Sequence, residues 1–175
     1  MSPRAHRLTA LGLGVTLDAA WLGRAPASHA PGLIPILLVL AGTLLGARAP
    51  DVLEVATFVG GRRASVIPHR TLTHWIPLWV AALYGMWRLW QLPVRPGVLA
   101  FTLGFTAAGA LHVATDFLTP IGVPLWLPLP YRRIRMPLCH TGNLPEEALV
   151  SALLIVFALA AVFLLVHPTV PLARL

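Results

Sequence analysis

Five apolar runs divide the chain, and they limit what it can fold into. They cover about residues 8–22, 33–47, 75–92, 97–118 and 148–167, with segments containing Gly and Pro between them. Only 11% of the residues are charged, whereas about a quarter of a soluble domain is charged. The chain therefore has too few polar side chains to cover its surface in water. Because a spanning helix needs roughly 17–25 mostly apolar residues, we predict one all-α membrane domain with about five transmembrane helices.

The arginines indicate which side of the membrane the loops occupy. If all five runs cross, one face carries the arginines at positions 4, 7, 48, 62, 63, 70, 132, 133 and 135, and the other carries those at 24, 88, 95 and 174. Basic residues are enriched in cytoplasmic loops, so we expect the first face to be cytoplasmic. In a membrane protein, a net charge of +7 is explained by arginines in cytoplasmic loops and by their contacts with lipid headgroups. Nucleic acid is therefore not an expected partner.

His112 and Asp116 lie four residues apart in "HVATD", near the end of the fourth run, and this spacing puts them on one helical face. An ionisable pair at membrane depth is costly and normally faces a protein interior, a cavity or an ion. Two interpretations remain open for the pair. It forms a buried hydrogen bond that fixes helix packing, or it binds a metal.

His69 and His74 are five residues apart in "HRTLTH", so they diverge on one regular helix. They converge only if His69 lies in the preceding loop and His74 opens the helix, with Thr71 or Thr73 as the cap. Two such histidines, taken alone, are more often interfacial polar residues than metal ligands.

The case for a metal site depends on convergence. Asp51 and Glu54 can share a helical face. Taken alone, they would be interpreted as the solvated start of a helix. The crossing count brings six candidate donors to one side of the membrane: His6, Asp51, His69, His74, His112 and Asp116. Imidazole and carboxylate donors without thiolate suit zinc, manganese or iron. Such a metal activates water, so the predicted chemistry is hydrolysis.

Two further groups of charged residues follow the fourth run. The segment "YRRIR" supplies Arg132, Arg133 and Arg135, which can bind a phosphate or a lipid headgroup or can serve only as a cytoplasmic anchor. Glu146 and Glu147 are candidates, with Glu54, for moving protons during catalysis. The alternative for Glu146 and Glu147 is a favourable position at a helix N-terminus.

These motifs resemble a bacterial family of membrane-bound metal-dependent hydrolases, the YdjM-like proteins, also described as LexA-binding and inner-membrane-associated. The family has an early His, then P-D-x-D-H, H-R-G-x-T-H-S and H-x-x-x-D-x-x-T-x-x-G. This chain has a histidine at position 6, then "PDVLE", "HRTLTHW" and "HVATDFLTPIG". The resemblance extends to about residue 147 and implies these metal ligands: Asp51, His69, His74, His112 and Asp116. The chain departs from the pattern in having Leu53 for Asp, Glu54 for His, Thr71 for Gly and Trp75 for Ser.

Together, the residues and the resemblance predict a multi-pass protein of the bacterial inner membrane with a metal site facing the cytoplasm. The metal is zinc, manganese or iron, and the favoured substrate is a phosphoester or other ester of a membrane lipid. One alternative is a non-catalytic adaptor with a structural site, which would recruit a cytoplasmic regulatory protein. Another is a metal or proton transporter, which the clustering of the donors on one side disfavours.

Overall fold

Long helices account for most of the fold. The computed structural model describes residues 1–24, 32–54, 56–59, 62–65, 70–125 and 132–166. Its long helices are α1 (Pro3–Arg24), α2 (Leu33–Gly46), α4 (Ile76–Trp90), α5 (Pro96–Phe117) and α6 (Leu144–Val166). Each overlaps one of the five apolar runs, so the helical prediction is confirmed.

Short elements lie between the long helices. They are α3 (Ala49–Val52), a 3₁₀ turn (Leu72–His74), and the strands β1 (Ala56–Val59), β2 (Arg62–Ser65), β3 (Val123–Pro124) and β4 (Arg133–Ile134). The strands form two antiparallel ribbons, in which Ala56 pairs with Ser65 and Val123 pairs with Ile134. Neither ribbon could be predicted from the sequence, because each strand has at most four residues and is too short to give a clear alternating pattern.

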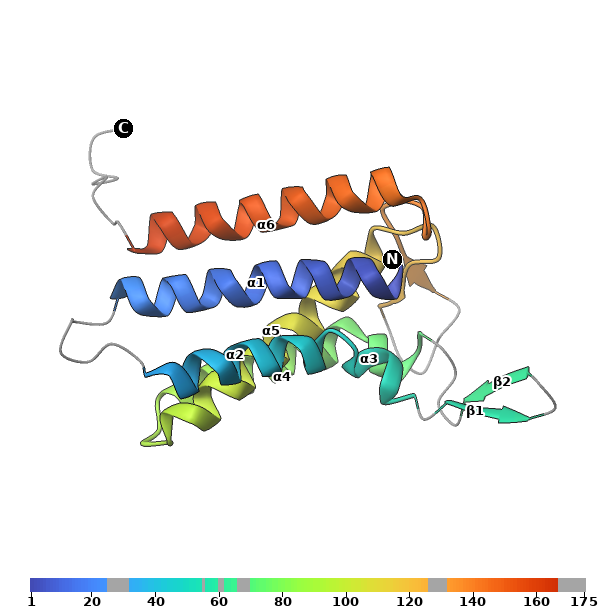
Figure 1. The fold of residues 1–175 in the computed structure, drawn as a ribbon. Coiled ribbons are helices and arrows are strands. Elements are labelled where there is room, and N and C mark those ends of the chain that lie inside the picture. Colours follow the sequence, from blue (N-terminus) through green and yellow to red (C-terminus); the bar gives the residue numbers. More distant parts are fainter. Residues whose placement is uncertain (25–31, 55, 60–61, 66–69, 126–131, 167–175) are drawn as a thin grey trace.

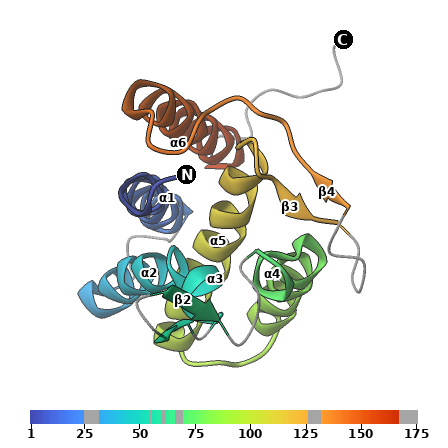
Figure 2. The ribbon, with the colours of Figure 1, turned by 90° about the vertical axis from the view of Figure 1, so that its right-hand side faces the viewer.

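Helix α5 occupies the centre of the bundle, as Figure 2 shows end-on. It packs against α2, α4 and α1, and α6 lies along the other side of α1. The β1–β2 ribbon projects beyond the helices at the end where the chain begins (Figure 1). The same end holds α3 and the C-terminal end of α5, so it gathers segments that are far apart in the sequence.

Glycine lets α2 and α5 approach closely. A Cβ atom on Gly104 of α5 would overlap the carbonyl oxygen of Val39, and one on Gly46 of α2 would overlap that of Phe105. Small residues at such crossings let two helix backbones come into van der Waals contact, which is a common means of packing helices in membranes. This contact places the last turns of α5 beside the C-terminal end of α2.

A small apolar cluster joins the short elements to the helices. Ala49, Trp79, Val113 and Val123 are buried together, and Ile134 of β4 packs against them. The indole N–H of Trp79 also donates a hydrogen bond to the carbonyl oxygen of Thr73, with a donor–acceptor distance of 2.8 Å. The cluster thus fixes α3 and the 3₁₀ turn against α5.

The outer faces of the helices are rich in large apolar side chains. Leu8 of α1, Ile34 of α2, Tyr84 of α4 and Phe157 of α6 are each more than half exposed. Among the described residues, one helix, Pro96–Phe117, is long and apolar enough to cross a membrane, and Leu33–Gly46 is a shorter apolar helix. The structure therefore does not support the predicted number of five spans, which stays a prediction.

Candidate metal centre

Four separate elements deliver polar side chains to one end of the bundle. His112 and Asp116 lie in the last two turns of α5, Asp51 in α3, His74 at the end of the 3₁₀ turn, and His6 in the first turns of α1. Figure 2 looks onto this end. The structure thus brings together five of the six predicted donors. His69, the sixth, lies outside the described residues.

Four of these donors form a closed ring of carboxylate oxygens and imidazole nitrogens. Nε2 of His74 lies 3.5 Å from Oδ1 of Asp51 and 3.5 Å from Oδ2 of Asp116. Nε2 of His112 completes the ring, 3.8 Å from Asp51 Oδ1 and 3.7 Å from Asp116 Oδ2. Carboxylate and imidazole therefore alternate around the ring.

Three donors of this ring are spaced to hold a metal ion, because Asp51, His74 and His112 each offer an atom within 4.8 Å of the other two. Metal–ligand bonds of about 2.0–2.2 Å in a tetrahedron separate neighbouring ligand atoms by about 3.3–3.6 Å. The separations along the ring, 3.5–3.8 Å, exceed that range by a few tenths of an ångström at most, although the four donors together do not form a group within 4.8 Å among the described residues. Nε2 of His112 and Oδ2 of Asp116 are moreover buried without a hydrogen-bond partner within the described part of the chain. The residues present can therefore hold a metal.

A backbone carbonyl fixes the orientation of His112. Its Nδ1 lies 2.7 Å from the carbonyl oxygen of Ala47, just beyond α2. A carbonyl only accepts hydrogen bonds, so Nδ1 carries the hydrogen and Nε2 keeps its lone pair. Metal-binding histidines commonly donate their second N–H in this way, which fixes the tautomer and the ring plane.

Glu54 orients His74 in a similar way. Its Oε1 lies 3.3 Å from Nδ1 of His74, and neither side chain is exposed. The same oxygen accepts a hydrogen bond from the backbone N–H of Arg70 at 2.9 Å. The predicted shared face of Asp51 and Glu54 is wrong, because α3 ends at Val52. Instead the two carboxylates approach opposite nitrogens of one imidazole.

The predicted caps of "HRTLTH" are also wrong. Helix α4 begins after Trp75, and neither Thr71 before the 3₁₀ turn nor Trp75 before α4 supplies a side-chain cap. The hydroxyl of Thr73 lies 3.1 Å from Nδ1 of His74. The five-residue spacing of the two histidines required that no single regular helix contain both. This prediction agrees with the structure, because the 3₁₀ turn Leu72–His74 precedes α4.

Arg70 is a site residue that the sequence analysis counted only as a topological arginine. Its Nη2 lies 2.9 Å from Oδ1 of Asp116, and its Nη1 donates to the Thr119 hydroxyl at 3.2 Å. The side chain is buried, and the backbone φ of 55° lies in the left-handed region, which is costly for arginine. Its place inside "HRTLTH", between two predicted ligands, is the one signal in the sequence.

Asp116 is therefore shared between two environments. Oδ1 contacts Arg70 and the α-amino group of Met1, the latter at 2.6 Å, and Oδ2 faces His74 and His112. His6 lies on the Oδ1 side, with Nε2 3.4 Å from that oxygen, and its ring stacks on that of His112 at 3.7 Å. His6, His112 and Asp116 thus form a second group whose donors lie within 4.8 Å of one another.

The pKa values of two donors outside the long helices are shifted. Burial acts to raise the pKa of Asp51, but the hydrogen bond from His74 and the charges of His112, His74 and His6 outweigh it and lower that pKa to about 2. Burial acts to lower the pKa of His74, but Asp116 and Asp51 outweigh it and raise that pKa. Negative carboxylates therefore stabilise a proton on His74, and a bound metal would replace that proton.

The remaining predicted catalytic carboxylates have structural contacts. Glu147 is buried and accepts hydrogen bonds from the Ser2 hydroxyl, at 2.6 Å, and from the Gly142 backbone. It ties α6 to the start of α1. Glu146 accepts a hydrogen bond from the backbone N–H of His140 at 2.6 Å. Their part in catalysis stays a prediction.

The three arginines of "YRRIR" lie at the β4 strand. Arg132 and Arg133 are exposed, and Nη1 of Arg135 donates to the carbonyl oxygen of Pro120 at 2.7 Å. No contact joins these arginines to the four-donor ring among the described residues. Substrate binding by them stays a prediction.

The comparisons with known proteins bear on the family. A family model described as YdjM inner membrane protein matches residues 1–170, nearly the whole chain. A search of curated proteins and a search of solved structures each find no match. The family match agrees with the motifs and with the apolar outer faces of the helices. The chain belongs to the YdjM inner membrane protein family.

Proposed function

We propose that the protein is a metal-dependent hydrolase of the bacterial inner membrane, and that its site faces the cytoplasm. The observation that carries the proposal is the four-donor ring of Asp51, His74, His112 and Asp116. Alternating imidazole and carboxylate donors suit zinc best, with manganese or iron as alternatives. A metal bound there would supply an activated water for attack on an ester.

The other residues of the site prepare this ring. Ala47 and Glu54 hold the two imidazoles so that each presents Nε2 to the carboxylates. Arg70 holds Asp116 through Oδ1, which leaves Oδ2 for the ring. A guanidinium near the ring is also suited to stabilise negative charge that develops on a substrate oxygen.

Access to the ring supports a membrane-surface substrate. The Asp51 side chain is 36% exposed, whereas those of His74, His112 and Asp116 are at most 1% exposed. A reactant would therefore approach over α3, at the ends of the helices. We propose that all five long helices cross the bilayer, which would bring this end to headgroup depth and make an ester of a membrane lipid the favoured substrate.

A non-catalytic adaptor is the second candidate, and one observation favours it. Asp116 already contacts Arg70 and the Met1 amino group, so its charge is balanced within the protein. In that case the ring is a polar packing network, and a cytoplasmic regulatory protein is the partner.

The test uses purified protein in detergent with a panel of phosphoester and carboxylester substrates. We expect turnover that chelation abolishes and that zinc or manganese restores, and we expect His112→Ala to lose it. His140→Gln is the control, because the His140 side chain is 71% exposed and contacts Glu146 instead of the ring. Chelator-sensitive turnover that survives in His112→Ala would refute the assignment, and bound metal without any turnover would favour the adaptor.

A further inference from the structure

A hollow of about 470 Å³ lies where α2, α3 and α5 meet. Six residues line it: Leu45, Arg48, Ala49, Val52, Leu53 and Phe105. Its volume lies within the roughly 300–1,000 Å³ typical of ligand pockets. Four of the six belong to the short segment that carries Asp51, the exposed donor of the ring, although Asp51 itself does not line the hollow.

The lining combines apolar surface with one positive charge. Val52 and Leu53 are 59% and 50% exposed, and Leu45 is also exposed. Arg48 is exposed too, and it makes no ion pair with any residue that the structure describes. No acidic side chain lines the hollow. Such a surface is complementary to a molecule with a hydrocarbon part and an anionic head.

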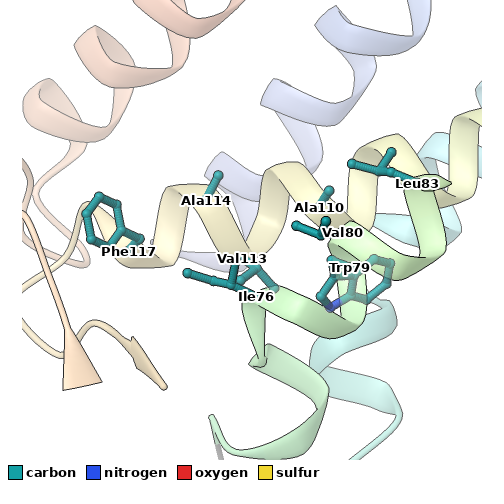
Figure 3. Close-up of a pocket in the computed structure, with 8 residues that line it drawn as sticks. All are labelled: Ile76, Trp79, Val80, Leu83, Ala110, Val113, Ala114 and Phe117. Atoms are coloured by element: carbon teal, nitrogen blue, oxygen red, sulfur yellow. The ribbon is translucent and has the colours of Figure 1, made fainter. Parts of the chain in front are cut away.

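A second hollow provides a comparison within the same protein. It lies between α4 and α5, has a volume of about 200 Å³, and is lined by apolar side chains alone, among them Trp79, Val80 and Phe117 (Figure 3). It can take hydrocarbon but has no group that selects an anion. The two hollows therefore differ in the charge of Arg48.

We propose that the hollow beside Arg48 binds a bilayer phospholipid, with its phosphate on Arg48 and one acyl chain against Leu45, Val52 and Phe105. Arginine matches phosphate oxygens with paired hydrogen bonds, and membership of an inner membrane protein family makes the bilayer the source of the ligand. Leu53 and Val52 lie at its open side and contact the remaining hydrocarbon.

That this lipid is also the substrate rests on the proposed function. Hydrolysis of its phosphoester would break one P–O bond. Water would supply the hydroxyl group to phosphorus and a proton to the departing alcohol. Asp51, on the segment that lines the hollow, is the donor through which the lipid would meet the ring.

The test measures lipid binding by native mass spectrometry of the full chain in detergent, with phosphatidylglycerol and phosphatidylcholine as probes. Arg48→Gln removes the charge and Val52→Phe fills the hollow. Val80→Phe is the matched control, because Val80 is also 59% exposed and lines the second hollow. Circular dichroism and thermal melting check that each variant folds, and Arg48→Lys tests whether a positive charge restores binding.

We expect Arg48→Gln to weaken phosphatidylglycerol binding about tenfold, as loss of a charge-assisted hydrogen bond predicts, and to remove the preference over phosphatidylcholine. Val52→Phe should weaken both lipids, Val80→Phe should bind as wild type does, and Arg48→Lys should recover part of the preference. Equal binding by wild type, Arg48→Gln and Val52→Phe would overturn the proposal.

The two proposals fail separately. Selective lipid binding that Val52→Phe removes, without any turnover, would retain the hollow and reject the hydrolase. Turnover of a soluble phosphoester that requires His112, with no selective lipid binding, would retain the hydrolase and reject the hollow.

Discussion

Glu54 and His74 meet in the interior of the protein, with Oε1 of the carboxylate 3.3 Å from Nδ1 of the imidazole and neither side chain exposed. The contact directs Nε2 of His74 toward Asp51 and Asp116. Glu54, at a position where the family pattern has histidine, thus orients a candidate ligand. Glu54 therefore supports the ring without belonging to it.

This contact predicts that Glu54 controls metal affinity. Loss of such an orienting partner typically weakens metal binding about 10–100-fold, so Glu54→Ala should weaken it by that factor and Glu54→Gln by less. Competition with a chromophoric chelator measures the change. Glu146→Gln should bind metal as wild type does. Unchanged affinity in Glu54→Ala would mean that His74 needs no support from this carboxylate.

Arg70 should matter for stability as well as for the site. Its guanidinium and Asp116 form a buried ion pair at 2.9 Å, and removal of one partner from such a pair typically costs about 3–5 kcal/mol. Arg70→Gln should therefore lower the free energy of unfolding by that order, measured by denaturant titration in detergent. The exposed Arg133→Gln is the control and should change it little. Equal losses in the two variants would contradict the assigned role.

The close approach of α2 and α5 makes Gly104 intolerant of a side chain. The added Cβ of Gly104→Ala would overlap the Val39 carbonyl, and overpacking of this kind costs about 1–3 kcal/mol. Gly85→Ala in α4 is the matched control, because nothing lies within 4 Å of its added Cβ. Thermal melting in detergent should show a lower Tm for Gly104→Ala alone. A Tm equal to that of wild type would mean that the two helices pack less closely.

Glu147 should act through the packing of α1. Its carboxylate accepts a hydrogen bond from the Ser2 hydroxyl at 2.6 Å, so Glu147→Ala leaves a partly buried donor unpaired at a cost of about 1–3 kcal/mol. We expect a lower Tm with metal content retained. Turnover by Glu147→Ala at temperatures where it stays folded distinguishes this role from proton transfer. Complete loss of turnover without loss of stability would assign Glu147 to catalysis instead.

The sequence predicted the parts of this account that depend on periodicity and spacing. Apolar runs located the five long helices, and the i,i+4 spacing put His112 and Asp116 on one face. The crossing count predicted that Asp51 and His74 lie on the same side of the membrane as that pair, and all four meet at one end of the bundle, although the five spans stay a prediction. The sequence did not predict the contacts that orient the donors. Ala47 contributes a backbone carbonyl, and Arg70 itself adopts the left-handed backbone conformation before the 3₁₀ turn. Neither leaves a pattern in side-chain type.

Glu54 illustrates a second limit. Glu54 was predicted to share a helical face with Asp51, and this expectation assumed that the helix of α3 continued to residue 54. The chain leaves the helix after Val52, which turns Glu54 inward under His74. A helix of four residues is too short for its end to be located from sequence.

Metal content of detergent-purified protein decides whether the four-donor ring is a metal site. Elemental analysis should be made on wild type, on the His74→Ala, Asp116→Ala double variant, and on Glu146→Gln. We expect near-stoichiometric zinc, manganese or iron in wild type and Glu146→Gln, and its loss in the double variant. Wild-type protein that holds no metal even after reconstitution would contradict this expectation, and the four-donor ring would then be a polar packing network.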